Sequence, residues 1–275
     1  MPALIFDCDG VLADTEKDGH LPAFNAAFAE VGLPVEWSEA EYAEKVKIGG
    51  GKERIASVFT PELDATIGVS TDVERADWIK KLHLRKTALF TQRVADGLLP
   101  GRPGIRRIIA DALADGWTIA VASTSAEPSV RAVLKHAAGE ASYERAHIFA
   151  GDIVHAKKPA PDIYLKVLED LQLSPVECVV VEDSGIGVAA AVAAGLTTVV
   201  TVSAFTAEDD FTSAALILTD LGDPGVPATV LSAPAGVTPT GGTPAGPASP
   251  SPADHTAGYL TLADLTALLA KEHTT

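Results

Sequence analysis

The sequence predicts an α/β fold, a doubly wound parallel sheet with a helical module inserted into it, and three patterns support this prediction. Short apolar runs alternate along the chain with segments whose apolar residues recur at helical spacing. The runs are continuous rather than alternating, which is typical of strands buried on both faces of a parallel sheet. Residues 7–117 separate the first run from the second, which is too long for a single crossover connection.

The elements of the sheet region follow from these runs. The expected helices include Gly104–Asp115 and Ile163–Leu171. The expected strands are Ala3–Phe6, Thr118–Ala122, His147–Ala150, Cys178–Val181, Thr197–Val202 and Ala214–Leu218. This alternation assigns residues 1–14 and 96–275 to the α/β core.

The inserted module is expected over residues 15–95. This segment is rich in Ala, Glu and Lys, which favour helices. Two capping boxes, Ser38–Glu41 and Thr71–Glu74, indicate helix starts, because each places a hydroxyl side chain three residues before a Glu. We therefore expect helices throughout the module.

The C-terminal region has a different composition. Eight prolines and six glycines occur between Pro224 and Gly258, almost without charged residues. This content marks low complexity, and we expect residues 224–258 to be a flexible surface insertion within the core, rather than a docking segment for a partner. A short helix is expected after it, over Leu262–Lys271.

The charge balance limits the partners of the protein. Its 275 residues include 37 acidic and 21 basic side chains, which give a formal net charge of −16. This balance disfavours nucleic acid and anionic membrane surfaces as general partners. An anionic substrate would therefore need a local cationic site, made by a metal ion and a few placed Lys or Arg side chains.

Cysteine usage and the N-terminus indicate the compartment. Cys8 and Cys178 lie in or beside apolar runs and are too few for a disulfide framework, which favours a reducing environment. The N-terminus runs straight into the first strand without the features of a secretory signal. No apolar stretch reaches the roughly 20 residues that span a bilayer. We expect a soluble, cytoplasmic monomer.

Asp7 and Asp9 directly follow the first expected strand. In an open parallel sheet, ligands bind at the carboxyl ends of the strands. Two neighbouring carboxylates tolerate burial only if a cation lies between them or one of them holds a proton. A divalent metal and a proton-transferring carboxyl satisfy both conditions, whereas an isolated Asp-x-Asp-Gly would usually be a polar turn.

Three further groups follow other expected strands. Ser123–Ser125 offers a hydroxyl and free N–H groups to a phosphate oxygen, although taken alone it is only a helix cap. Lys158 precedes two prolines that fix the backbone and should aim its ammonium in one direction. Glu182 and Asp183 again need a cation, and their hard oxygen ligands favour magnesium.

Together these groups resemble the motifs of a known family. Asp7-x-Asp9-Gly-Val, Ser123, Lys158-Pro and Glu182-Asp183 are similar to the four signature motifs of the haloacid dehalogenase superfamily, whose core is a Rossmann-like doubly wound sheet. The 15–95 module resembles the helical cap of its β-phosphoglucomutase-like branch. Within the cap, Gly50–Ile55 and His83–Thr87 are most similar to CbbY-type xylulose-1,5-bisphosphate phosphatases.

The resemblance implies a magnesium-dependent phosphatase that acts on a small sugar phosphate, with xylulose 1,5-bisphosphate as the expected substrate. It implies that Asp7 is a nucleophile that forms an aspartyl-phosphate, and that Asp9 is the general acid and base. The groups implied to hold the phosphoryl oxygens are Ser123, the backbone of Thr124, and Lys158. The implied magnesium ligands are Asp7, Asp9 through its backbone carbonyl, Glu182 and Asp183.

The cap is implied to carry specificity. The residues that the resemblance places near the sugar and its distal phosphate are Glu16, His20, Gly50, Gly51, Lys52, Arg54, His83 and Lys86. A second phosphate would explain why an acidic protein keeps Lys52, Arg54 and Lys86 facing the cleft. For any one of these cations, a solvated helix face is an equally good explanation.

Two other functions stay open. A β-phosphoglucomutase would use the same Asp7 and Asp9 and return the phosphoryl group to a sugar hydroxyl. A noncatalytic phosphometabolite-binding protein predicts a damaged motif, and none is found. A dehalogenase is disfavoured because it would not need Asp9 together with the Glu182-Asp183 pair.

Overall fold

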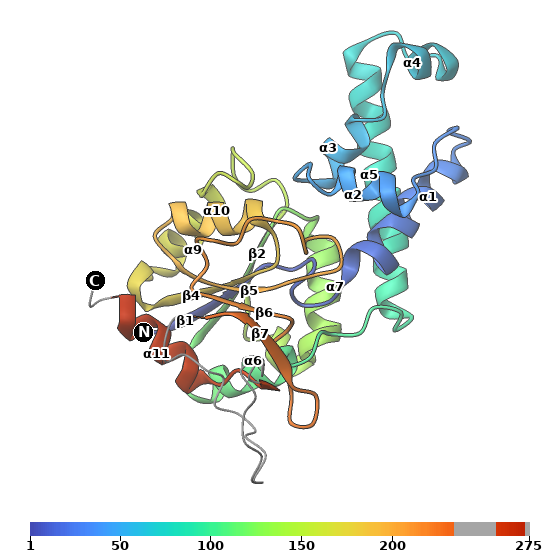
Figure 1. Ribbon diagram of the computed structural model, residues 1–275. Coiled ribbons are helices and arrows are strands. Elements are labelled where there is room, and N and C mark those ends of the chain that lie inside the picture. Colours follow the sequence, from blue (N-terminus) through green and yellow to red (C-terminus); the bar gives the residue numbers. More distant parts are fainter. Residues whose placement is uncertain (234–256, 273–275) are drawn as a thin grey trace.

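The computed structural model describes residues 1–233 and 257–272, and its centre is a mixed sheet. The described strands are β1 (Ala3–Phe6), β2 (Thr118–Ser123), β3 (His147–Ala150), β4 (Cys178–Glu182), β5 (Thr197–Thr201), β6 (Leu216–Leu218), β7 (Ala228–Ser232) and β8 (Ala257–Gly258). Their order is β3-β2-β1-β4-β5-β6-β7-β8, parallel from β3 to β6 and antiparallel for β7 and β8 (Figure 1). The predicted doubly wound parallel sheet is confirmed.

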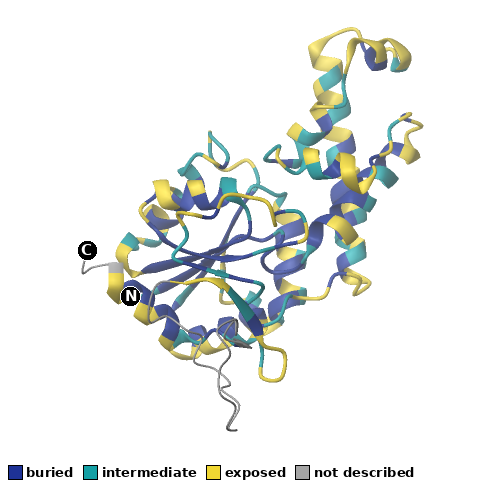
Figure 2. Cartoon of the chain, in the orientation of Figure 1, coloured by how far each residue is buried: buried dark blue, intermediate teal, exposed yellow. Residues whose placement is uncertain are grey.

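Helices cover both faces of the sheet, because successive strand residues point to opposite sides. Leu4 and Phe6 of β1 pack into a cluster with α6 (Ile105–Ala114), α7 (Glu127–Ala138) and α11 (Leu262–Glu272). Ala3 and Ile5 pack on the other side against α9 (Asp162–Leu171) and α10 (Gly185–Ala193). All four residues of β1 are fully buried, and the central strands are uniformly buried in Figure 2. Continuous apolar runs are therefore the correct signature of these strands.

The far edge of the sheet differs in detail from the sequence-based expectation. β6 begins at Leu216 rather than Ala214, because the N–H of Ala214 closes a turn on the carbonyl of Phe211 at 2.9 Å. β7 was not predicted, since it lies in the Pro/Gly-rich 224–258 segment. It extends the sheet by antiparallel pairing with β6. β8 lies at the other end of that segment, and residues 234–256 between the two strands lie outside the described residues.

Residues 16–95, all of which the structure describes, form helices without a strand. The elements are the π-helical turn η1 (Glu16–His20), α1 (Leu21–Glu30), α2 (Glu39–Lys45), α3 (Gly51–Ala56), α4 (Pro61–Ile67) and α5 (Asp72–Ala95). Both predicted capping boxes are present, at Ser38 before α2 and at Thr71 before α5. An aromatic cluster of Phe24, Phe28, Trp37 and Tyr42 forms the centre of the module. Figure 1 shows α1–α5 gathered beside the sheet, outside its layers.

The two linkers between the sheet and the helical module run side by side. Ala13 of the outgoing linker forms a bridge with Gly101 of the returning linker. The N–H of Arg102 donates to the carbonyl of Leu12 at 3.0 Å. The module therefore joins the core at one point, next to the carboxyl end of β1. None of the helices in the described ranges has both the length and the apolar composition needed to cross a lipid bilayer.

Candidate active site

The site is built at the carboxyl ends of three neighbouring strands. β2, β1 and β4 are adjacent and parallel, so Ser123, Asp7 and Glu182 emerge at the same edge of the sheet. The N–H of Asp7 still continues the ladder, donating to the carbonyl of Val181 at 2.9 Å. Sequence positions more than a hundred residues apart are thus brought together by strand register alone.

Three carboxylates meet at this edge. Oxygens of Asp7, Glu182 and Asp183 lie within 4.8 Å of one another, and all three residues are buried. Lys158 Nζ lies 2.6 Å from Asp7 Oδ1 and 2.6 Å from Glu182 Oε1, and it donates to the carbonyl of Ala122 at 3.1 Å. The Lys158 ammonium therefore contacts two of the three acids.

Electrostatics show that this cluster has an excess of negative charge. Burial, together with the charges of Glu182 and Asp9, raises the pKa of Asp7 to about 7 despite the opposing charge of Lys158. Burial and Glu182 raise the pKa of Asp183 well above its usual value. A hard divalent cation among these oxygens would remove that excess, so the donor set fits magnesium.

Neighbouring residues fix the orientation of these acids. Ser203 Oγ donates to Asp183 Oδ2 at 2.6 Å, and Tyr164 OH donates to Glu182 Oε1 at 2.6 Å. Gly10 has a φ of +79°, and a Cβ at this position would collide with the Asp183 carboxylate. The backbone of the Asp9 loop and the side chain of Asp183 are therefore in direct contact, which only glycine allows.

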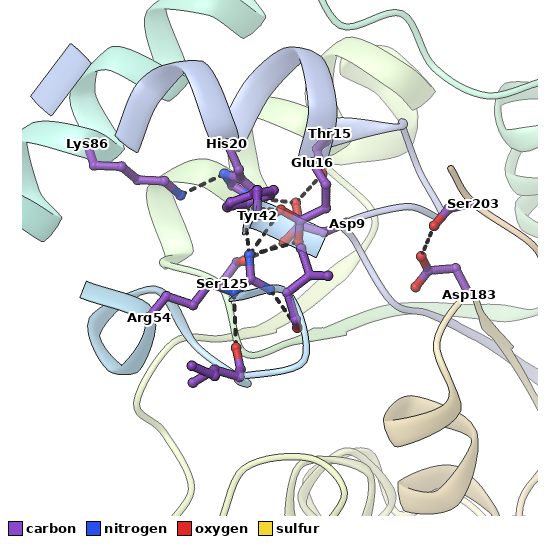
Figure 3. Close-up of polar contacts among 12 residues, drawn as sticks. Asp9, Thr15, Glu16, His20, Tyr42, Arg54, Lys86, Ser125, Asp183 and Ser203 are labelled. Carbon is purple, nitrogen blue, oxygen red and sulfur yellow. Dashed lines mark hydrogen bonds and ion pairs between the residues drawn. The ribbon is translucent and has the colours of Figure 1, made fainter. Parts of the chain in front are cut away.

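Asp9 lies apart from the cluster and faces the helical module (Figure 3). Its Oδ1 accepts hydrogen bonds from Thr15 Oγ1 at 2.6 Å and from His20 Nε2 at 2.8 Å, and its Oδ2 accepts one from Ser125 Oγ. Burial alone would raise the pKa of Asp9, but His20 and the two hydroxyls lower it far below its usual value. Asp9 is accordingly a carboxylate in this arrangement.

Lys86 extends this chain from the opposite side of His20. Its Nζ lies 2.6 Å from His20 Nδ1 and 4.5 Å from the centre of the Phe24 ring, while the His20 ring stacks on Phe90 at 4.1 Å. Burial lowers the pKa of Lys86 to about 8, against the charges of Asp9 and Glu16. Nδ1 of His20 therefore faces the Lys86 ammonium, and Nε2 faces Asp9.

Glu16 and Arg54 form a partly buried ion pair in the module, with each side chain 12% exposed. Arg54 Nη1 lies 3.0 Å from each oxygen of Glu16 and 2.8 Å from Tyr42 OH, and Tyr42 OH also donates to Glu16. The remaining Arg54 nitrogens donate to the carbonyls of Ile48 at 3.0 Å and Val46 at 3.3 Å. The guanidinium therefore holds the loop before α3 as well as Glu16.

A cavity of about 330 Å³ joins these groups between the sheet and the helical module. The sequence-predicted residues that line it are Asp7, Asp9, Glu16, His20, Gly50, Gly51, Arg54, Lys86, Ser123, Thr124, Lys158 and Asp183. Glu182 is fully buried behind Asp7 and Lys158. A cleft lined by lysine and arginine side chains, carboxylates and hydroxyl groups is suited to an anionic substrate.

Comparison with known proteins decides the family. Residues 1–195 match the model of haloacid dehalogenase-like hydrolases. The chain belongs to this family. It is an enzyme of the predicted class, a phosphoric monoester hydrolase, and the helical module corresponds to the cap named in the sequence analysis.

Individual relatives support the predicted branch. The chain is 47% identical to the CBBY-like protein of Arabidopsis thaliana over 81% of this chain and 70% of that one. It is 45% identical to the plasmid-encoded CbbY of Cupriavidus necator, over 82% and 88%. A crystal structure of a mutant CbbY from Rhodobacter sphaeroides in complex with xylulose-(1,5)bisphosphate superposes with a TM-score of 0.71. It is 35% identical and covers 82% of this chain and 97% of that chain.

Two predicted cap residues do not line this cleft. Lys52 and His83 border a neighbouring cavity of about 360 Å³, which shares only Gly51 and Thr124 with the first. Lys52 pairs there with Asp152 of the core, and Lys157 pairs with Glu53 at 2.6 Å and Asp152 at 3.1 Å. Of the three cations expected to face one cleft, Arg54 and Lys86 line it in this structure, whereas the ammonium of Lys52 is held by a core carboxylate.

Several residues of the site were not singled out from the sequence. Ser203 follows β5, so the rule that assigned Asp7 and Glu182 to strand ends could have found it. Tyr164 lies inside α9 and Tyr42 inside α2, where an aromatic residue is most simply a core residue. Arg102 follows the returning linker and has no motif around it.

Proposed function

We propose that this enzyme is a magnesium-dependent phosphatase of a small sugar bisphosphate, with xylulose 1,5-bisphosphate as its substrate. One observation carries the proposal. A cationic lysine and three buried carboxylates lie at the floor of the cleft, and over 82% of its length the chain resembles a CbbY solved with that bisphosphate. The carboxylates explain the metal, and the relative suggests the sugar.

Asp7 is the proposed nucleophile. Its Oδ1 is paired with Lys158, which leaves the other oxygen as the natural attacking atom. Attack on phosphorus forms an aspartyl-phosphate as the bond to the sugar oxygen breaks. Ser123, the Thr124 backbone and Lys158 would hold the phosphoryl oxygens, where negative charge is greatest in the transition state.

Magnesium would be held by Asp7, Asp183 and the backbone carbonyl of Asp9, with Glu182 close by. When bound, it supplies positive charge that offsets the carboxylates and stabilises the phosphoryl oxygens. Ser203 and Tyr164 contribute by keeping Asp183 and Glu182 in fixed orientations, so that little reorganisation is needed.

Asp9 is the proposed general acid and base. Its low pKa makes it a carboxylate in the substrate-free arrangement, which suits the second step, where it accepts a proton from the attacking water. In the first step it must give a proton to the sugar oxygen. That proton has to reach Asp9 after substrate enters, and His20 is the one titratable group among its hydrogen-bond donors, because the Thr15 and Ser125 hydroxyls do not ionise near neutral pH.

The test is phosphate release from a panel that includes xylulose 1,5-bisphosphate, ribulose 1,5-bisphosphate and β-glucose 1-phosphate. Rapid magnesium-dependent release from the first, abolished by Asp7→Asn and by EDTA, is expected. Isomerisation of β-glucose 1-phosphate without net release would instead identify a mutase. Undiminished release in EDTA would contradict the proposed role of the carboxylates.

A further inference from the structure

Arg102 lies where the returning linker re-enters the core. Its N–H donates to the carbonyl of Leu12 at 3.0 Å, directly after the bridge between Ala13 and Gly101. A Cβ at Gly101 would lie 3.0 Å from the Cα of Ala137, so the linker is pressed against α7. These contacts hold the chain in a defined position where it re-enters the core.

The guanidinium of Arg102 binds backbone carbonyls of three separate segments. It donates to Thr201 at 3.0 Å and Val202 at 2.7 Å at the end of β5, and also to Gly10 and Thr219. A planar fork of five N–H donors can serve several carbonyls at once, which a lysine ammonium cannot do in the same geometry.

These carbonyls belong to the loops that carry the chemistry. Gly10 follows Asp9, and its backbone touches the carboxylate of Asp183. Val202 precedes Ser203, whose hydroxyl holds Asp183 at 2.6 Å. Arg102 thus contacts both loops that orient Asp9 and Asp183, although it does not line the cleft.

The choice of a charged side chain at this position needs an explanation. Its guanidinium hydrogen-bonds to backbone carbonyls rather than to a carboxylate, and partly burying a guanidinium is unfavourable unless its donors are satisfied. The carboxylates of Asp183, Asp14 and Asp220 act on it through space. A stabilising role alone could be filled by an apolar residue, whereas donating to four carbonyls at once suits the planar guanidinium of arginine.

We propose that Arg102 is a positioning residue that locks the base of the cap linkers, the Asp9 loop and the Ser203 loop into one unit. Through these loops it sets the placement of Asp9 against Asp183. The expected effect of Arg102 on kcat rests on the proposed function. The coupling of the loops by Arg102 does not depend on which substrate is used.

Arg107 offers a matched control. It also donates to carbonyls, those of Leu221 at 3.2 Å and Gly222 at 2.7 Å, and it pairs with Asp223 at 3.3 Å. These partners are away from the cleft. Replacement of Arg107 therefore reports the general effect of losing arginine-to-backbone bonds.

The experiment compares Arg102→Lys with Arg107→Lys, with Arg102→Gln in reserve if the first does not fold. We expect R102K to lower kcat by about tenfold or more with KM nearly unchanged, because displaced catalytic groups reduce turnover. The rise in melting temperature caused by magnesium should also shrink in R102K. R107K should leave both quantities unchanged.

Hydrogen exchange makes the test independent of activity. In R102K, the amides of residues 8–13 and those of residues 202–206 should both exchange faster than in the wild type. In R107K, the same amides should exchange at the wild-type rate. In the wild-type chain, the amides of Gly10 and Ser203 should be as protected as those of β1. Equal effects of R102K and R107K, or unprotected Gly10 and Ser203 amides in the wild type, would overturn the proposal. A wild-type chain without phosphatase activity but with the expected exchange would refute only the proposed function.

Discussion

Asp9 and His20 are joined by a hydrogen bond of 2.8 Å between Oδ1 and Nε2, which links the catalytic loop of the core to the first turn of the cap. Thr15 and Ser125 donate to the same carboxylate from a linker and from the end of β2 (Figure 3). The proposed general acid and base is therefore positioned by residues from both domains, so its protonation responds to how the cap sits on the core.

Replacing His20 by Phe tests this link. Phenylalanine keeps the stacking on Phe90 but removes both ring nitrogens, so Asp9 and Lys86 each lose a partner. We expect kcat to fall about a hundredfold, the range typical of losing control over a proton-transferring group. The exposed His155 gives a control, since His155→Phe should leave kcat unchanged. A kcat for H20F within threefold of the wild type would contradict this role.

The pKa of Lys86 predicts an alkaline limit to activity. Burial lowers this pKa to about 8, so Lys86 is charged below pH 8 and loses its charge above it. Because kcat/KM reports the free enzyme, its pH profile should fall above pH 8 as the donor to His20 is weakened. Lys86→Met should lower kcat/KM at pH 7 and remove this limb. If kcat/KM of K86M still falls above pH 8 as it does in the wild type, the fall is caused by the titration of another group.

Tyr42 connects the two polar residues of the cap. Its OH donates to Glu16 and accepts from Arg54 Nη1 at 2.8 Å. Tyr42→Phe keeps the ring in the aromatic cluster and removes the hydrogen bonds to Glu16 and Arg54. The Glu16 side chain should therefore be held less firmly in its orientation toward the cleft. We expect KM to rise about threefold to tenfold with kcat nearly constant, as for loss of one hydrogen bond to a charged group. A fall in kcat with unchanged KM would place Tyr42 with the reaction instead.

Asp7→Asn should stabilise the metal-free protein in a pH-dependent way. The folded-state pKa of about 7 exceeds the ordinary value of 3.8, so the folded chain binds the extra proton between these values. The stability that Asp7 contributes is present below pH 3.8 and is lost as pH rises through 7. The melting temperature of D7N relative to the wild type should therefore increase from pH 5 to pH 8.

Asp152→Asn is the control for this measurement. Hydrogen bonds from Lys52 and Lys157 lower the pKa of Asp152 to about 2, so it is ionised at both pH 5 and pH 8. Its replacement should change the melting temperature equally at the two pH values. If D7N also changes the melting temperature equally at pH 5 and pH 8, the pKa of Asp7 is not raised in the folded protein.

The core of the site could be predicted because strand ends fix it. Asp7, Ser123 and Glu182 each follow a continuous apolar run, and parallel register then brings them to one edge without further information. Each of these residues lies where the sequence analysis expected it. Lys158 follows a loop rather than a strand, and its position depends on the two carboxylates that bind it.

The cap was less predictable because its side chains are oriented by partners distant in sequence. Lys52 is turned away from the cleft by Asp152, a hundred residues later, and no local pattern encodes that pairing. His83 and Lys86 lie three residues apart on α5, yet they border different cavities. The position of the Arg102 side chain depends on hydrogen bonds to the backbone carbonyls of four residues. Every residue has a backbone carbonyl, so the sequence contains no pattern that predicts these contacts.

The most direct test of the central claim is to trap the covalent intermediate on Asp7. The enzyme, turning over xylulose 1,5-bisphosphate with magnesium, is quenched with acid, reduced with borohydride and analysed by peptide mass spectrometry. Reduction of an aspartyl-phosphate gives homoserine, so the N-terminal peptide should carry homoserine at position 7, only when substrate and magnesium are both present. Rapid turnover with unmodified Asp7, or with homoserine at Asp9 instead, would contradict the account.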